Sequence, residues 1–99
     1  MDYVDHIAIQ VKNIKKSTKW YLDNFKCKIL YIDDTWALIE FENIKLALVT
    51  KSQHPPHFAI LDKNLKNDEK TVEHRDGSVS KYIQDNDKNF IEIIKYRDW

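Results

Sequence analysis

A histidine-led strand pattern occurs twice in this 99-residue chain, as HIAI at residues 6–9 and as HFAI at residues 57–60. Alternate side chains of a strand point to opposite faces. Each copy therefore carries its histidine and alanine on one face and two large apolar residues on the other. The repeat, 51 positions long, predicts a single domain made of two related modules, module one over 1–52 and module two over 53–99.

The first half of the chain predicts the order β-α-β-β-β. Residues 3–11 alternate as a strand does, with a fully apolar face and a face that carries His6. Asn13 can cap a helix that runs to about Phe25, because its side-chain oxygen can accept hydrogen bonds from the first-turn amides. Strand-like runs follow at 27–33, 35–42 and 44–50. We expect the helix to cover the apolar face of the first strand.

The second half predicts the same strands with its helix shortened or lost. Two prolines lead into the strand at 57–62, and the connection at 63–70 is short and polar. Asp76-Gly77 predicts a hairpin, because glycine tolerates the positive φ that such turns require. The strands around it and after it are expected at 71–75, 78–84 and 90–96. The fold class is therefore α+β.

Composition narrows the classes of partner and compartment. Sixteen basic and sixteen acidic residues give zero formal net charge, so no positive excess favours nucleic acid or an anionic membrane. Cys27 is the only cysteine, which excludes an intramolecular disulfide and paired-cysteine zinc sites. No apolar run approaches the roughly 20 residues of a membrane span. We expect a cytoplasmic protein that binds neither nucleic acid nor membrane.

Two segments resemble the signatures of the vicinal oxygen chelate superfamily, which includes glyoxalases, bleomycin-resistance proteins and extradiol dioxygenases. Residues 5–28, DHIAIQVKNIKKSTKWYLDNFKCK, are similar to its first strand and helix. The matching positions are Asp5-His6, Val11, Ile14, Ser17, Trp20-Tyr21 and Phe25. Residues 85–92, DNDKNFIE, are similar to its second signature. The resemblance implies two paired βαβββ modules that form a curved mixed sheet around a cleft.

The resemblance also implies a metal in that cleft, bound by the first and last strands of each module. Carried over by position, the ligands are His6, His57 and Glu92. Module one should offer a glutamate near residue 48, and it has Leu48 instead. Two imidazoles and a carboxylate suit a divalent metal such as Zn²⁺, Mn²⁺, Ni²⁺ or Fe²⁺. Three protein ligands leave open positions for water and substrate.

Two of the three proposed ligands also have a purely structural interpretation. His6 could be a core histidine hydrogen-bonded to backbone, and Glu92 could lie on the exposed face of an amphipathic strand. His54 is a competing ligand candidate, although the prolines after it indicate a connection. His74 is expected to face solvent in a hairpin.

Further candidates come from residues that could line the cleft. The candidates for substrate binding are Gln10, Tyr31, Trp36 and Tyr82. Ordinary core packing is the alternative for each of them, and it is the favoured interpretation for Phe41. Glu40 or Glu42 is a weak candidate for a general base.

Two main functions remain open, and a third, weaker possibility is a degenerate copy that acts only as an interaction partner. The first is a metal-dependent lyase, isomerase, transferase or dioxygenase that acts on a small-molecule substrate with vicinal oxygens. The second is a metal-free small-molecule binding protein of the bleomycin-resistance type, which the missing fourth ligand favours. Loss of the second helix would uncover Phe58, Ile60, Ile91 and Ile93. An exposed apolar patch usually marks an interface, so a homodimer is expected.

Overall fold

The computed structural model describes residues 1–97, which contain one helix and eight strands. In chain order these are β1 (Tyr3–Gln10), α1 (Ile14–Asn24), β2 (Lys28–Ile32), β3 (Trp36–Glu40), β4 (Lys45–Val49), β5 (His57–Leu61), β6 (Val72–Glu73), β7 (Val79–Gln84) and β8 (Phe90–Lys95). The predicted order of elements is confirmed. Two compact units make up the chain: the first unit is residues 6–56, and the second unit is residues 1–5 with the chain from 57 onward.

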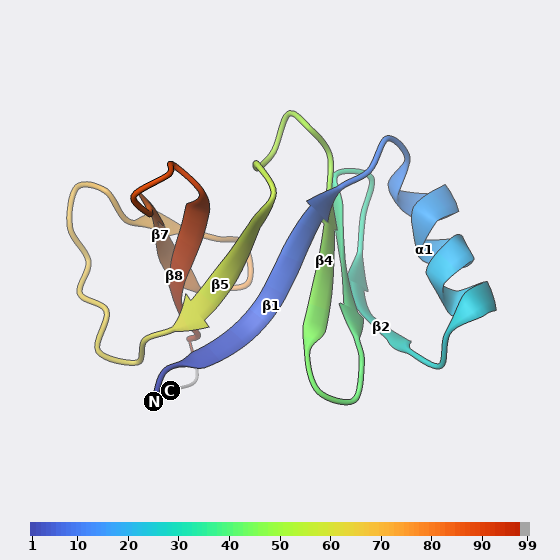
Figure 1. The fold of residues 1–99 in the computed structure, drawn as a ribbon, viewed down its shortest axis with the longest axis horizontal. Helices are drawn as coiled ribbons and strands as arrows, with labels where there is room; N and C mark the ends of the chain where they lie inside the picture. The colour runs from blue at the N-terminus through green and yellow to red at the C-terminus, as the bar shows by residue number, and fades with distance from the viewer. Residues whose placement is uncertain (98–99) are drawn as a thin grey trace. The chain divides into compact units, whose positions relative to one another are not determined.

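The first unit is a mixed sheet in the order β2-β3-β4-β1. Short turns join β2, β3 and β4 into antiparallel neighbours, whereas β1 runs parallel to β4 (Figure 1). A parallel pair needs a long crossover connection, which α1 and the two strands after it supply. The βαβββ order therefore closes with its first strand beside its last.

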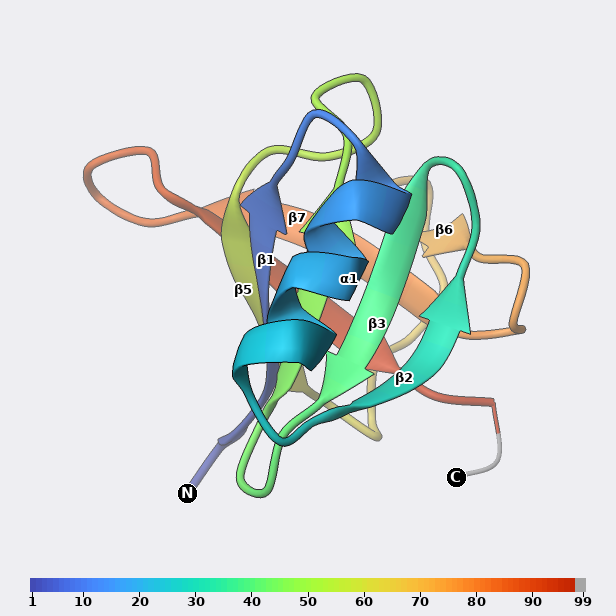
Figure 2. The ribbon, with the colours of Figure 1, turned by 90° about the vertical axis from the view of Figure 1, so that its right-hand side faces the viewer.

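Helix α1 begins where the sequence predicts. The Asn13 side chain accepts a hydrogen bond from the backbone N–H of Lys16 at 2.9 Å, which satisfies one orphan amide of the first turn. The helix lies over the sheet of the first unit, in front of β3 in Figure 2. The buried core between helix and sheet consists of Ile14, Ala37, Ile39 and Leu48. At 11 residues, α1 is the only described helix, and it is too short to cross a membrane.

The second unit repeats the sheet of the first without its helix. Its strand order is β5-β8-β7-β6, with β5 parallel to β8 and β7 antiparallel to β8 and β6. Where the first unit has α1, the second has an irregular connection over residues 62–71, in which Leu65 is buried. The predicted loss of the second helix is confirmed for the described residues.

Losing that helix leaves apolar side chains on one face of the second sheet. Phe58, Ile91 and Ile83 pair across β5, β8 and β7 and form a row on this face. Phe58 is 38% exposed and Ile83 45% exposed, while Ile91 is half-buried. The expected exposure is confirmed for Phe58, whereas Ile60 and Ile93 are half-buried as well.

Candidate metal centre

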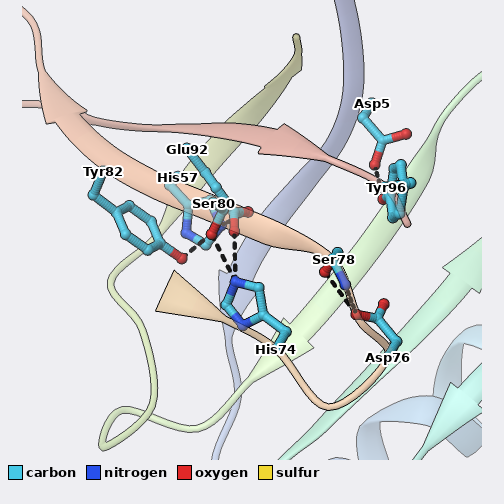
Figure 3. A network of polar contacts seen from close by, with 9 residues as sticks. All are labelled: Asp5, His57, His74, Asp76, Ser78, Ser80, Tyr82, Glu92 and Tyr96. Carbon is cyan, nitrogen blue, oxygen red and sulfur yellow. Dashed lines mark hydrogen bonds and ion pairs between the residues drawn. The ribbon is translucent and has the colours of Figure 1, made fainter. Parts of the chain in front are cut away.

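Polar side chains gather on the other face of the second sheet. Glu92 lies on β8, between β5 and β7, and pairs in register with Ala59 on one side and Tyr82 on the other. His57 is two residues before Ala59, and Ser80 is two residues before Tyr82. Because side chains alternate along a strand, His57, Ser80, Tyr82 and Glu92 share this face, as Figure 3 shows.

His57 and Glu92 form a buried pair at the centre of this face. The His57 Nε2 lies 3.2 Å from Glu92 Oε1, and the residues are 8% and 5% exposed. A carboxylate oxygen can only accept, so in the metal-free chain the imidazole Nε2–H donates. A buried carboxylate is stable only with such a partner or with a bound cation. The pair therefore offers one nitrogen and one oxygen donor side by side.

Tyr82 lies next to this pair. Its hydroxyl oxygen is 3.4 Å from His57 Nε2, and the two rings meet edge to face with centroids 5.0 Å apart. Burial raises the pKa of Tyr82 above its usual value, and the negative charge of Glu92 raises it further. Tyr82 therefore stays a neutral phenol that can donate or accept a hydrogen bond, and it is unsuited to act as a general base.

His74 joins the same group, contrary to the expectation that it faces solvent. It is half-buried, and its Nε2 lies 2.6 Å from Ser80 Oγ and 3.7 Å from Glu92 Oε2 (Figure 3). The hairpin brings it there, since the His74 N–H donates to the Ser78 carbonyl at 2.8 Å. Pairing across the Asp76-Gly77 turn was the signal that could have identified it, because residues that pair across a hairpin share a face.

His6 in the first unit is 7% exposed. It lies on the sheet face opposite α1, with Ala8, while Ile9 of the alternate parity packs against the core below the helix. The prediction that the histidine and the apolar residues of this strand lie on opposite faces is confirmed. Its role as a metal ligand stays a prediction.

The register of the two sheets corrects the position expected for a fourth ligand. Glu92 pairs with Ala59, two residues after His57, and the first unit has Ala8 two residues after His6. Ala8 pairs with Ala47, so Ala47, and not Leu48, is the equivalent of Glu92. A shift of one residue moves a side chain to the other face, and Leu48 accordingly lies in the core under α1. No carboxylate stands at the equivalent position.

The substrate-binding candidates of the first unit have partners within that unit. Tyr31 stacks on Trp36 with centroids 4.4 Å apart and planes 24° apart, and its hydroxyl donates to Asp33 Oδ2 at 2.5 Å. The Gln10 side-chain amide donates to the His54 carbonyl at 3.0 Å. Phe41 packs against the core, as expected.

The candidates for a general base lie at the surface of the first unit. Glu40 and Glu42 are exposed, and Glu40 Oε1 is 3.8 Å from the Lys28 ammonium. Both line a hollow of about 490 Å³ together with Cys27 and its neighbours. A catalytic role for either residue stays a prediction.

No protein-family model matches the sequence, and no curated protein matches it. Several solved structures match the fold. A hypothetical protein from Bacillus halodurans is 17% identical with a TM-score of 0.78, over 99% of this chain and 96% of that one. Methylmalonyl-CoA epimerase from Streptomyces coelicolor, in complex with 2-nitronate-propionyl-CoA, is 11% identical with a TM-score of 0.75, over 94% and 96%. A glyoxalase/bleomycin resistance protein/dioxygenase superfamily member from Vibrio splendidus is 9% identical with a TM-score of 0.67, over 96% and 99%.

Proposed function

We propose, on the premise that the chain has the vicinal oxygen chelate fold of these solved structures, that it binds a divalent metal and a small substrate with two adjacent oxygens. The observation that carries the proposal is the buried pair of His57 and Glu92, 3.2 Å apart on one sheet face. Tyr82 beside them is the third element, a neutral hydrogen-bonding group next to the metal donors.

The donor atoms of the pair fit a metal. Two ligand atoms bound to one zinc ion at 2.0–2.2 Å in tetrahedral geometry lie about 3.3 Å apart, and the His57 and Glu92 donors are already 3.2 Å apart. We propose His6 as the third ligand, because it has the same place relative to Ala8 and Ala47 that His57 has relative to Ala59 and Glu92. Zn²⁺, Mn²⁺, Ni²⁺ and Fe²⁺ all accept such ligands.

The chain's own residues would bind and orient the substrate. A metal bound there would supply a Lewis acid for the two substrate oxygens. Tyr82, kept protonated by burial, would donate a hydrogen bond to a substrate oxygen and so orient the substrate. Ala47 stands at the position where a fourth protein ligand would be expected. The reaction class proposed is lyase, isomerase, transferase or dioxygenase.

One observation favours a second function, the metal-free binding of a small planar ligand. The first unit has alanine where the second has Glu92, so only the second unit has a last-strand carboxylate at this position. The aromatic ring of Tyr82, beside His57 in the second unit, would suit a planar ligand. Under either function we propose a homodimer and retain the cytoplasm as the compartment.

The test is metal retention by purified protein. The protein is supplied with Zn²⁺, Mn²⁺, Ni²⁺ or Fe²⁺, dialysed, and assayed by elemental analysis and titration calorimetry. We expect one ion per chain, and a loss of affinity in His6→Ala, His57→Ala and Glu92→Gln that exceeds the roughly 10- to 100-fold typical of residues beyond the ligands. His54→Ala and Glu40→Gln are the matched controls and should bind as wild type does. If wild-type protein retains no stoichiometric metal, the metal-dependent function is excluded and the metal-free binding function remains.

A further inference from the structure

We infer that His74 is a positioning residue, which holds the Glu92 carboxylate from the side opposite His57. The inference rests on the proposed function, in which Glu92 is a metal ligand. It assigns a role to a histidine that the sequence pattern places at a hairpin surface.

The two oxygens of Glu92 face two different imidazoles. Oε1 lies 3.2 Å from His57 Nε2, and Oε2 lies 3.7 Å from His74 Nε2 (Figure 3). A carboxylate held at one oxygen can still turn about its last side-chain bond. A polar group that faces each oxygen restrains this rotation, and ligand orientation of this kind is the usual role of residues just outside a metal's ligands.

His74 is itself held at several points. Its Nε2 lies 2.6 Å from the hydroxyl of Ser80, a residue that is 1% exposed. Its N–H donates to the Ser78 carbonyl, and its carbonyl accepts from the Gly77 N–H at 2.9 Å. Gly77 has φ +86°, a conformation that glycine adopts without strain. Asp76 Oδ1 accepts from the Ser78 N–H at 2.9 Å and from its hydroxyl at 2.6 Å.

These contacts favour a role beside the ligands over a role as a ligand. The His74 Nε2 lies 2.6 Å from the Ser80 hydroxyl and 3.7 Å from Glu92 Oε2, so Ser80 engages it more closely than Glu92 does. A nitrogen committed to a hydroxyl has no lone pair directed at a metal. Ser80 therefore fixes the imidazole, and the imidazole fixes the carboxylate.

The experiment compares His74→Phe, which keeps a flat ring without nitrogen, with His74→Gln, whose amide can reach the Nε2 position. In metal-free protein, NMR measures the exchange of the His57 Nε2 proton with water. Titration calorimetry with Zn²⁺ measures affinity. We expect His74→Phe to speed the exchange several-fold and to weaken Zn²⁺ binding about 10- to 100-fold. His74→Gln should restore most of both, which a purely structural role would not do.

Ser80→Ala provides a second route if His74→Phe does not fold, because it leaves the imidazole and removes its anchor. It should change both measurements in the same direction by a smaller factor. If His74→Phe or Ser80→Ala equals wild type in both, or if glutamine fails to rescue a folded protein, the positioning role is overturned. Should wild type bind no metal, the proposed function fails, and proton exchange at His57 alone decides whether His74 positions Glu92.

Discussion

At the scale of single residues, the two sheets differ most at the positions that carry chemistry. Glu92 pairs with Tyr82 across β7 and β8, and the equivalent pair in the first unit is Ala47 with Leu38. The β1–β4 and β5–β8 registers match, so Ala47 and Glu92 occupy equivalent positions with different side chains. An isolated carboxylate on such a face would be costly to bury, and Glu92 meets that cost with imidazoles facing both of its oxygens.

Thr18 presents the opposite case, a buried polar group without compensation. Its hydroxyl has no hydrogen-bond partner among the residues that the structure describes, and the residue is 2% exposed in α1. A buried unsatisfied hydroxyl costs about 1–3 kcal/mol, and valine has nearly the same shape and helix propensity. We expect Thr18→Val to raise the free energy of unfolding by about 1 kcal/mol, measured by urea denaturation.

Thr35→Val is the matched control for that substitution. The Thr35 hydroxyl donates to Asp33 Oδ1 at 2.9 Å, so valine removes a made hydrogen bond and should destabilise the protein. A Thr18→Val protein less stable than wild type would contradict the description of its hydroxyl as uncompensated.

The sequence predicts some residues of the candidate site and misses others, for identifiable reasons. His57 and Glu92 could be predicted because they lie on strands whose parity and family resemblance both point to them. The expectation that His74 faces solvent was wrong: pairing across the hairpin indicates the face that it shares with Ser80, but only tertiary packing decides whether that face is buried. The prediction that Leu48 is the equivalent of Glu92 was wrong, because the register between β1 and β4 is set by the crossover and its core. A strand's alternation alone does not fix that register.

At the scale of elements, the β2–β3 turn is organised by one carboxylate. Asp33 Oδ1 accepts hydrogen bonds from the backbone N–H groups of Thr35 and Trp36 at 2.7 and 2.9 Å, and Oδ2 accepts from the Tyr31 hydroxyl. The bond from Tyr31 is the largest cause that lowers the pKa of Asp33 well below 3.8, and the bonds from Thr35 and Trp36 lower it further. The hydrogen bonds that hold the turn are therefore strongest when Asp33 is ionised.

The stability of this turn should depend on pH. Because the folded-state pKa lies below the unfolded value of about 3.9, ionised Asp33 contributes stability above that pH, which is lost as pH falls toward the folded pKa. The free energy of unfolding of wild type should exceed that of Asp33→Asn by at most about 1 kcal/mol between pH 5 and 7, since solvent screens the site. That difference should shrink below about pH 4.

Denaturation curves of both proteins from pH 7 to pH 3 measure this effect. Asp34→Asn is the control, because the Asp34 side chain is 87% exposed and its pair with Lys15 is a surface contact. It should change stability little at any pH. An Asp33→Asn difference that is the same at pH 7 and pH 3 would contradict the assigned role of the charge.

The existence and order of the elements follow from local signals, whereas the burial of individual residues in the connections between them does not. Alternation, the Asn13 cap and the Asp76-Gly77 turn each act within a few residues, so the strands and helix could be predicted. The missing second helix could be predicted because residues 63–70 are too short and polar to form an amphipathic one. The burial of Leu65 within that connection could not, because it depends on tertiary packing.

At the scale of the whole molecule, the two similar sheets differ in how well their apolar faces are covered from solvent. The first unit covers its apolar face with α1, and Leu48 there is fully buried. The second unit leaves the row of Phe58, Ile91 and Ile83 without an equivalent helix among the described residues. Burying apolar area contributes roughly 25 cal/mol per Å². Association through this face would therefore provide the apolar burial that a second helix would otherwise provide.

We therefore expect wild-type protein to be a homodimer in solution, with this row in its interface. Light scattering after gel filtration at micromolar concentration should give twice the mass of one chain. Ile83→Lys should shift the population to monomer, because a lysine ammonium buried in an apolar contact loses its hydration. Ile32→Lys, at an isoleucine that is 38% exposed on β2 of the first unit, is the matched control and should remain dimeric. A monomeric wild type would contradict the prediction, and equal dissociation by both variants would locate the interface elsewhere.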